Sequence, residues 1–200
     1  MEGDKPIKMR VTDDGSPTLF CSEIEECYHS MYGARTESEY IFIRHGFDKV
    51  DKPRVRVFEV GMGTGLNLLL TMKMRSNKDI VYHAIEKYPV PMNLVNNLKQ
   101  NLQPEEQDMM SLIHGSQWET DVNLASHIVM RKMKGDMTEV DLPKQRYDVI
   151  YFDAFSPEKQ PEMWTADILK TCYDILDEGD ILVTYCSKGI VKRALRDVGY

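Results

Sequence analysis

Three closely spaced glycines are the first feature of the sequence that could do chemistry. Gly61, Gly63 and Gly65 follow an apolar run with the spacing G-x-G-x-G, and Glu59 stands just before them. Glycines at a turn between a strand and a helix let the backbone approach a ligand closely and adopt positive φ. A dinucleotide fingerprint, G-x-G-x-x-G, would need its last glycine at position 66, which is leucine, so a nicotinamide dinucleotide is disfavoured.

Three acids stand where later apolar runs end. Glu86 ends the second run, where an acid can accept hydrogen bonds from both hydroxyls of a ribose. Asp136 follows the third run and could accept from the amine of adenine, although Gly-Asp is also ordinary turn chemistry. Asp153 ends the fourth run and begins the string DAFSP, which predicts a rigid loop facing a substrate.

Alternating apolar runs and helical patterns must position these residues. Strands are predicted over 55–60, 80–85, 128–133, 147–152 and 181–185. Helices are predicted over 66–74, from Pro89 to 101, over 104–112, over 162–176 with Gly179 closing the helix, and over 189–198. Continuous apolar strands joined by helices indicate an α/β fold, with a parallel sheet covered on both faces. Ligands bind such sheets at the carboxyl ends of the strands, where the acids and glycines lie.

The first part of the chain has a different texture. Segments 8–11 and 18–21 predict a hairpin, and 40–43 is either a short strand or the end of a helix. We expect residues 1–52 to form an accessory segment on the substrate side. Residues 53–200 would form the ligand-binding core, and both parts would make one structural domain.

Composition bounds the remaining possibilities. A chain of 200 residues with 42% hydrophobic and 28% charged residues is typical of a globular domain. No apolar run approaches the roughly 20 residues that cross a bilayer, and the polar start lacks the apolar stretch of a signal peptide, so the cytoplasm is expected. The four cysteines and five histidines show no metal-ligand spacing, so no metal is expected.

A basic patch is the one feature that favours an anionic partner. Lys188, Lys192 and Arg196 recur every four residues, which places them on one face of the last helix, and Lys159 could extend the patch. The net charge of −7 argues against non-specific binding of nucleic acid but allows a local patch. A solvated helix face is the alternative.

Longer strings give a family resemblance over nearly the whole chain. The glycine loop with Glu59 resembles motif I of class I methyltransferases. Several stretches of the sequence resemble the methyltransferase half of the MnmC family. They are GTGLN (63–67), EKYP (86–89), DAFSP (153–157), PEMWT (161–165), TYCS (184–187), the helix 191–199, and an N-terminal match from YHS (28–30) to ESEYIF (37–42).

The resemblance implies a function. It implies a Rossmann-like class I methyltransferase with strand order 3-2-1-4-5, which methylates the aminomethyl group of a modified wobble uridine, 5-aminomethyl-2-thiouridine, in tRNA. Asp153 would lie at the reacting centre, and the basic patch would contact tRNA. S-adenosylmethionine would be bound through Glu59, Gly61, Gly63, Gly65, Asn67, Glu86 and Asp136.

The chain departs from this pattern twice. It has no room for the FAD-dependent oxidase half of the two-domain members, so a separate oxidase would act in the same pathway. Class I methyltransferases usually continue after the fifth strand and its helix with a further strand pair, whereas this sequence stops at Gly199-Tyr200. We therefore expect the fifth strand to be an open edge, either unpaired or swapped.

Other functions stay open at this point. The acidic net charge suits a methyltransferase that acts on a small molecule. A spermidine-synthase-like aminopropyltransferase would share the glycine loop and the acid after the second strand, although the longer strings disfavour it. If the chain is truncated, it could be a non-catalytic module that binds S-adenosylmethionine or tRNA.

Overall fold

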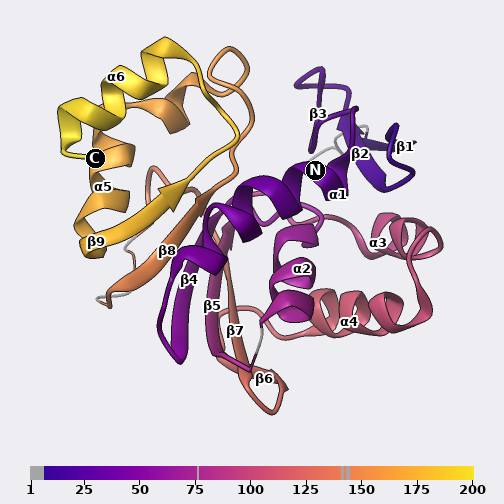
Figure 1. The fold of residues 1–200 in the computed structure, drawn as a ribbon. Coiled ribbons are helices and arrows are strands. Elements are labelled where there is room, and N and C mark those ends of the chain that lie inside the picture. The colour runs from indigo at the N-terminus through magenta and orange to yellow at the C-terminus, as the bar shows by residue number, and fades with distance from the viewer. Residues whose placement is uncertain (1–6, 76, 141, 143–144) are drawn as a thin grey trace.

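A mostly parallel six-stranded sheet forms the centre of the fold (Figure 1). The computed structural model describes residues 7–75, 77–140, 142 and 145–200, so most of the polar start lies outside the described residues. The strands are β4 (Arg54–Val60), β5 (Asp79–Glu86), β6 (Val122–Ala125), β7 (Ile128–Lys134), β8 (Tyr147–Phe152) and β9 (Leu176–Val183). Their spatial order is β6-β7-β5-β4-β8-β9, which confirms the predicted parallel order 3-2-1-4-5.

The two edges of the sheet differ from each other. The prediction of a sheet with five parallel strands was wrong in one respect, because the sheet has a sixth strand, β6, which is antiparallel to β7. Only Leu124 of β6 is buried, so no apolar run marked this strand in the sequence. At the other edge, β9 pairs only with β8 among the described residues, and the predicted open edge is confirmed.

Helices cover both faces of the sheet because successive side chains of a strand point to opposite faces. On β4, Val57 belongs to one core cluster and Phe58 to the other. One face carries α2 (Leu66–Met74), α4 (Pro104–Gly115) and the π-helical η1 (Glu39–Arg44), and the other carries η3 (Pro161–Trp164), α5 (Ala166–Asp174) and α6 (Gly189–Val198) (Figure 1). The segment 40–43, predicted as a strand or a helix end, is therefore helical.

Two helix starts differ from the prediction for local reasons. The helix α3 (Met92–Lys99) begins after Pro91 rather than at Pro89, because a residue that precedes a proline, here Val90, is disfavoured in the α region. The helix α5 begins at 166 because the Thr165 side chain accepts from the N–H of Ile168 as its cap.

The end of α5 and the start of the fifth strand were also placed wrongly. α5 ends at Asp174, and the fifth strand is Leu176–Val183 rather than 181–185. Gly179, expected to close the helix, lies inside β9 with φ 85°, where the register with β8 shifts. This strand starts irregularly and directly after a helix, so the sequence shows no alternation of apolar and polar residues from which its start could be predicted.

The N-terminal hairpin is confirmed and gains a third strand. β1 (Ile7–Val11), β2 (Pro17–Cys21) and the short β3 (Glu26–Cys27) form an antiparallel sheet, followed by α1 (Ala34–Ser38) and later by η2 (Phe47–Lys49). Leu19 of β2 packs in one cluster with Val95 and Leu98 of α3, which holds this small sheet against the main fold.

Among the described residues, no helix combines the length and apolarity needed to cross a membrane.

Candidate functional site

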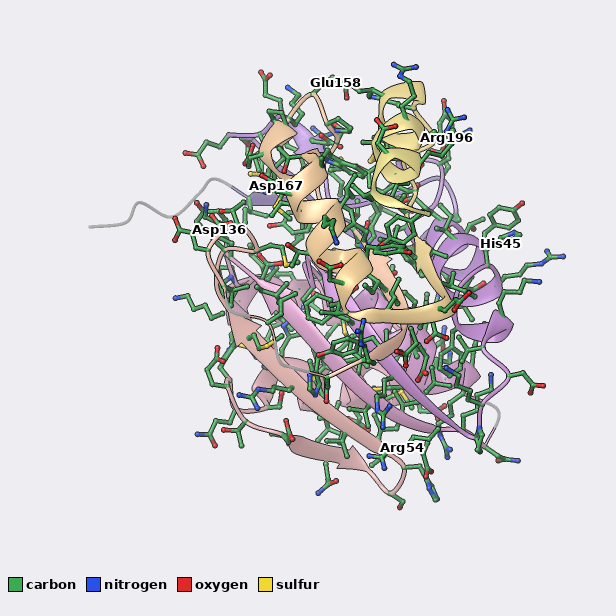
Figure 2. All side chains as sticks on the ribbon, turned by 90° about the vertical axis from the view of Figure 1, so that its left-hand side faces the viewer. His45, Arg54, Asp136, Glu158, Asp167 and Arg196 are labelled. Atoms are coloured by element: carbon green, nitrogen blue, oxygen red, sulfur yellow. The ribbon has the colours of Figure 1, made fainter. Side chains whose placement is uncertain are left out.

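A cavity of about 540 Å³ opens at the carboxyl ends of the central strands, a size typical of small-molecule sites. In Figure 2, Asp136 and Glu158 lie toward one end of the sheet, and Arg54, at the start of β4, lies at the other. Five residues predicted from the sequence line this cavity, namely Gly61, Gly63, Glu86, Asp136 and Asp153. The ends of four different strands and the loops that follow them therefore bring together residues that are far apart in the chain.

The glycine turn is packed so closely that side chains have no room. Gly61, Gly63 and Gly65 all have positive φ, of 85°, 50° and 78°. A Cβ on Gly61 would lie 2.6 Å from the backbone oxygen of Asp153, and one on Gly63 would lie 2.9 Å from Cδ1 of Tyr28. Gly65 caps the start of α2 and lies outside the cavity lining.

Glu86 joins the glycine turn to the end of β5. Its Oε2 accepts from the N–H of Gly63 at 2.9 Å and its Oε1 from the N–H of Tyr88 at 2.8 Å. A carboxylate can accept about four hydrogen bonds, so these contacts are compatible with further bonds to a diol in the cavity.

Replacement of Glu86 tests this placement. Glu86→Ala should weaken binding of the cofactor by roughly 1.5–3 kcal/mol, the usual worth of hydrogen bonds to a charged group. Isothermal calorimetry with S-adenosylhomocysteine gives the affinity. The exposed Glu139, outside the cavity lining, supplies the control Glu139→Ala, which should bind normally. Equal affinity of both folded variants would rule out Glu86 as a ligand.

Asp136 serves its own turn and also faces the cavity. Its Oδ1 accepts from the N–H and the hydroxyl of Thr138 at 2.9 and 2.8 Å, and its Oδ2 accepts from Lys87. Partial burial opposes ionisation, but the bonds from Lys87 and Thr138 prevail and lower the pKa of Asp136. Both interpretations of the Gly-Asp pair, turn and ligand, are therefore compatible with its position.

Asn67 links two carboxylates beneath and beside the cavity. Its Nδ2 donates to Oε1 of Glu59 at 2.9 Å and to Oδ2 of Asp153 at 2.8 Å. Glu59 is fully buried on β4, and neither it nor Asn67 lines the cavity. Their role as direct cofactor ligands stays a prediction. What the geometry shows is that Asn67, itself bonded to Glu59, holds Asp153 in place.

The electrostatics of Asp153 suit proton uptake. Burial raises its pKa to about 8, the hydrogen bond from Asn67 opposes the rise, and the charge of Glu37 adds to it. Burial also raises the pKa of Glu59 well above its ordinary value, against the bond from Asn67. A carboxyl whose pKa lies near the working pH is the kind of group that exchanges protons with a substrate.

Hydrogen bonds from two side chains hold the DAFSP loop in place. Trp164 donates its Nε1–H to the carbonyl of Phe155 at 2.8 Å, and the hydroxyl of Tyr185 donates to the carbonyl of Ala154 at 3.0 Å. Trp164 is buried, so the PEMWT string supports the loop that carries Asp153. A loop held by two side chains keeps that carboxylate in one position.

The N-terminal segment, expected on the substrate side, contributes a wall of the cavity whose individual contacts sequence patterns did not reveal. Tyr28 packs edge-to-face on Phe155 at 5.2 Å between ring centroids. Glu26 accepts from the Ser156 hydroxyl at 2.7 Å. These contacts join residues more than a hundred positions apart, so periodicity could not show them. The N-terminal match in the family resemblance, which begins at Tyr28, was the available signal.

The predicted basic patch is only partly free. Lys159 pairs with Glu25 at 3.0 Å and Lys188 pairs with Glu158. Lys192 and Arg196 are exposed on α6, and no ion pair to either is found within the part of the chain that the structure describes. Figure 2 shows Arg196 on α6 and Glu158 on a loop at the same end of the molecule. None of the four cations lines the cavity.

The parallel order, the glycine turn after β4 and the acid at the end of β5 define a Rossmann-like fold of the kind that class I methyltransferases have. Residues 96–200 match the family model described as S-adenosyl-L-methionine-dependent methyltransferase, and the chain belongs to this family. The cofactor is therefore S-adenosylmethionine, which the crowded glycine turn and the acid-lined cavity fit. No cluster of metal-binding side chains occurs among the described residues.

Individual relatives support the MnmC resemblance, which is confirmed. A bifunctional protein of tRNA 5-methylaminomethyl-2-thiouridine biosynthesis, MnmC, from Pseudoalteromonas atlantica is 27% identical over 98% of this chain. Its counterpart from Paraburkholderia phytofirmans is 28% identical over 98%. The chain spans only 31% and 32% of these relatives. The crystal structure of MnmC2 from Aquifex aeolicus superposes with a TM-score of 0.81 at 25% identity, over 99% of this chain and 65% of that one.

Proposed function

We propose that this protein transfers a methyl group from S-adenosylmethionine to the aminomethyl group of 5-aminomethyl-2-thiouridine at the wobble position of tRNA. The observation that carries the proposal is the match of 98% of the chain to a protein of tRNA 5-methylaminomethyl-2-thiouridine biosynthesis. We also propose that an FAD-dependent oxidase activity works in the same pathway, and that both act in the cytoplasm.

The predicted cofactor residues have separate tasks. The turn of Gly61 and Gly63 brings backbone against the ligand, Glu86 accepts from the ribose, and Asp136 accepts from the adenine amine. When bound, S-adenosylmethionine supplies a methyl group activated by a sulfonium. The remaining tasks, which are to bind the acceptor and to manage its proton, belong to the protein.

The acceptor amine must lose a proton before it can react. By comparison with lysine, its pKa is about 10, so at neutral pH it carries no lone pair. Asp153 lines the cavity, is held by Asn67 and has a pKa of about 8. It is the residue we propose to accept hydrogen bonds from the amine and to orient its lone pair. Alignment within the cavity then supplies much of the rate.

Binding to tRNA is proposed to use the exposed end of α6. Neutralising phosphates releases counterions, so affinity should fall steeply with salt, and each cation removed should reduce that slope by about one. We expect this result for Lys192→Ala and for Arg196→Ala, because both are exposed.

The experiment is a salt titration of tRNA binding by fluorescence anisotropy. Lys49→Ala on η2, just before β4, is the control and should keep the full slope. Unchanged slopes in the α6 variants would reject this surface. Affinity that does not depend on salt, or no measurable tRNA binding, would favour a small-molecule acceptor and count against the proposed function.

A further inference from the structure

Glu37 is an acidic residue of the cavity that has no role in the reaction proposed above. It belongs to α1 of the N-terminal segment and lines the same cavity as Asp153. Its Oε1 accepts from the N–H of Ser30 at 3.0 Å. No ion pair to Glu37 is found among the residues that the structure describes. A carboxylate fixed at one oxygen and facing a cavity needs a cationic partner or a proton.

The charge of Glu37 acts on Asp153, which lines the same cavity. The charge of Glu37 adds to the effect of burial in raising the pKa of Asp153. Burial also raises the pKa of Glu37, and the bond from Ser30 opposes that rise. Two carboxylates in one cavity disfavour each other's ionisation, and a cation placed between them relieves the conflict.

Among the described residues, the other ionisable groups around this pair do not supply such a cation. Burial raises the pKa of Tyr185, which stays neutral, and lowers the pKa of His29 to about 4, so that side chain is neutral too. Glu26 is bonded to Ser156, and Glu59 lies buried beneath Asp153.

The two cations that the described part of the chain contributes to the lining are engaged elsewhere. Lys87 is paired with Asp136, and the guanidinium of Arg10 lies 3.8 Å from the centre of the Phe20 ring. The neighbourhood of Glu37 and Asp153 is therefore a place where a ligand cation is stabilised.

We propose that Glu37 is the second anionic group of the acceptor site, which holds the cationic amine and remains ionised while Asp153 takes up the proton of that amine. This inference rests on the proposed function. The N–H bond of the ammonium breaks, its electron pair stays on nitrogen, and the proton goes to the Asp153 carboxylate. The lone pair forms the bond to the methyl carbon, and the carbon–sulfur electron pair goes to sulfur.

Two acids are needed because the nitrogen becomes positive again as the new bond forms. A carboxyl group that has just been protonated cannot offset this charge, whereas a second, ionised carboxylate can. After release of the methylated ammonium, Asp153 passes its proton to water, so the net reaction releases one proton. Glu37 also excludes anionic acceptors, since an extra negative charge beside it would be repelled.

The test is the pH dependence of methyl transfer to tRNA in Glu37→Gln. The amide oxygen still accepts from Ser30, so the fold is preserved while the charge is lost. Without that charge the pKa of Asp153 falls. The acid limb of the profile of kcat against pH should therefore shift to lower pH by about one unit. We expect kcat/KM at the plateau to fall about tenfold or more. Glu37→Asp should keep the wild-type limb.

Two controls make the result decisive. Glu39→Gln, which removes an acid paired with Arg35 outside the cavity lining, should behave like wild type. Binding of S-adenosylhomocysteine to Glu37→Gln should be unchanged, and its collapse would overturn the proposal by making Glu37 a cofactor ligand. Wild-type kcat/KM and pH profile in Glu37→Gln would also overturn it. If the wild-type chain itself transfers no methyl group to tRNA, the proposed function fails, and this inference fails with it.

Discussion

Asp153→Ala should lower kcat by about 10²-fold or more while the affinity for the cofactor stays nearly intact. The reason is that Asp153 lines the cavity at the end of β8 and is the acid we assign to the acceptor amine. Asp153→Asn is the sharper variant, because its amide oxygen can still accept from Asn67 and only the charge is lost. Both variants are measured by steady-state kinetics and by calorimetry.

The pH profile adds a second readout for the same residue. The pKa of Asp153 is raised to about 8, so its ionised fraction increases as pH rises through that value. In wild type, kcat should therefore rise with pH through this region, and the limb should be absent in Asp153→Asn. If cofactor affinity collapses while turnover at saturation survives, Asp153 holds the amino group of the cofactor instead, a task that Glu59 would share.

Gly61→Ala should reduce cofactor affinity by about a hundredfold or more, equivalent to about 2.7 kcal/mol. The new Cβ would lie 2.6 Å from the backbone oxygen of Asp153, and neither backbone can yield without moving the glycine turn and the DAFSP loop together. The positive φ of 85° adds strain for any residue with a Cβ. Gly63→Val should act in the same direction by pushing against Tyr28.

The chain offers a matched control for this prediction. Gly179 has the same φ of 85°, but a Cβ there would meet no atom within 4 Å. Gly179→Ala therefore carries the backbone strain without the crowding, and it should lose stability but keep the affinity. Thermal unfolding and calorimetry on both variants separate the two effects. Normal affinity in a folded Gly61→Ala would show that the turn does not approach the cofactor.

The sequence was most informative where a local rule applies. The strand β8 is a nearly continuous apolar run, and α6 ends at Val198 just before Gly199, which has φ 116°, so both were predicted with their observed bounds. The spacing of Gly61, Gly63 and Gly65 likewise located the turn whose positive φ the structure shows. The short strand β6 and the irregular start of β9 follow no such rule and were missed or misplaced.

The site was predictable as a list of residues but not as an arrangement. That Asp153 follows a buried strand can be read from the sequence. Its bond to Asn67, its raised pKa and the cavity that it shares with Glu37 depend on burial and on contacts between distant segments. The N-terminal wall illustrates the same limit, because the contact between Tyr28 and Phe155 exists only in the folded chain.

Transfer of a labelled methyl group from S-adenosylmethionine to tRNA tests the central claim most directly. The substrate is tRNA from cells that lack the final methylation, and the product is digested to nucleosides for chromatography and mass spectrometry. We predict label on the aminomethyl nitrogen of the wobble uridine with wild type, and almost none with Asp153→Asn. Label that appears only on a small amine, on another nucleoside, or nowhere would contradict the proposed function.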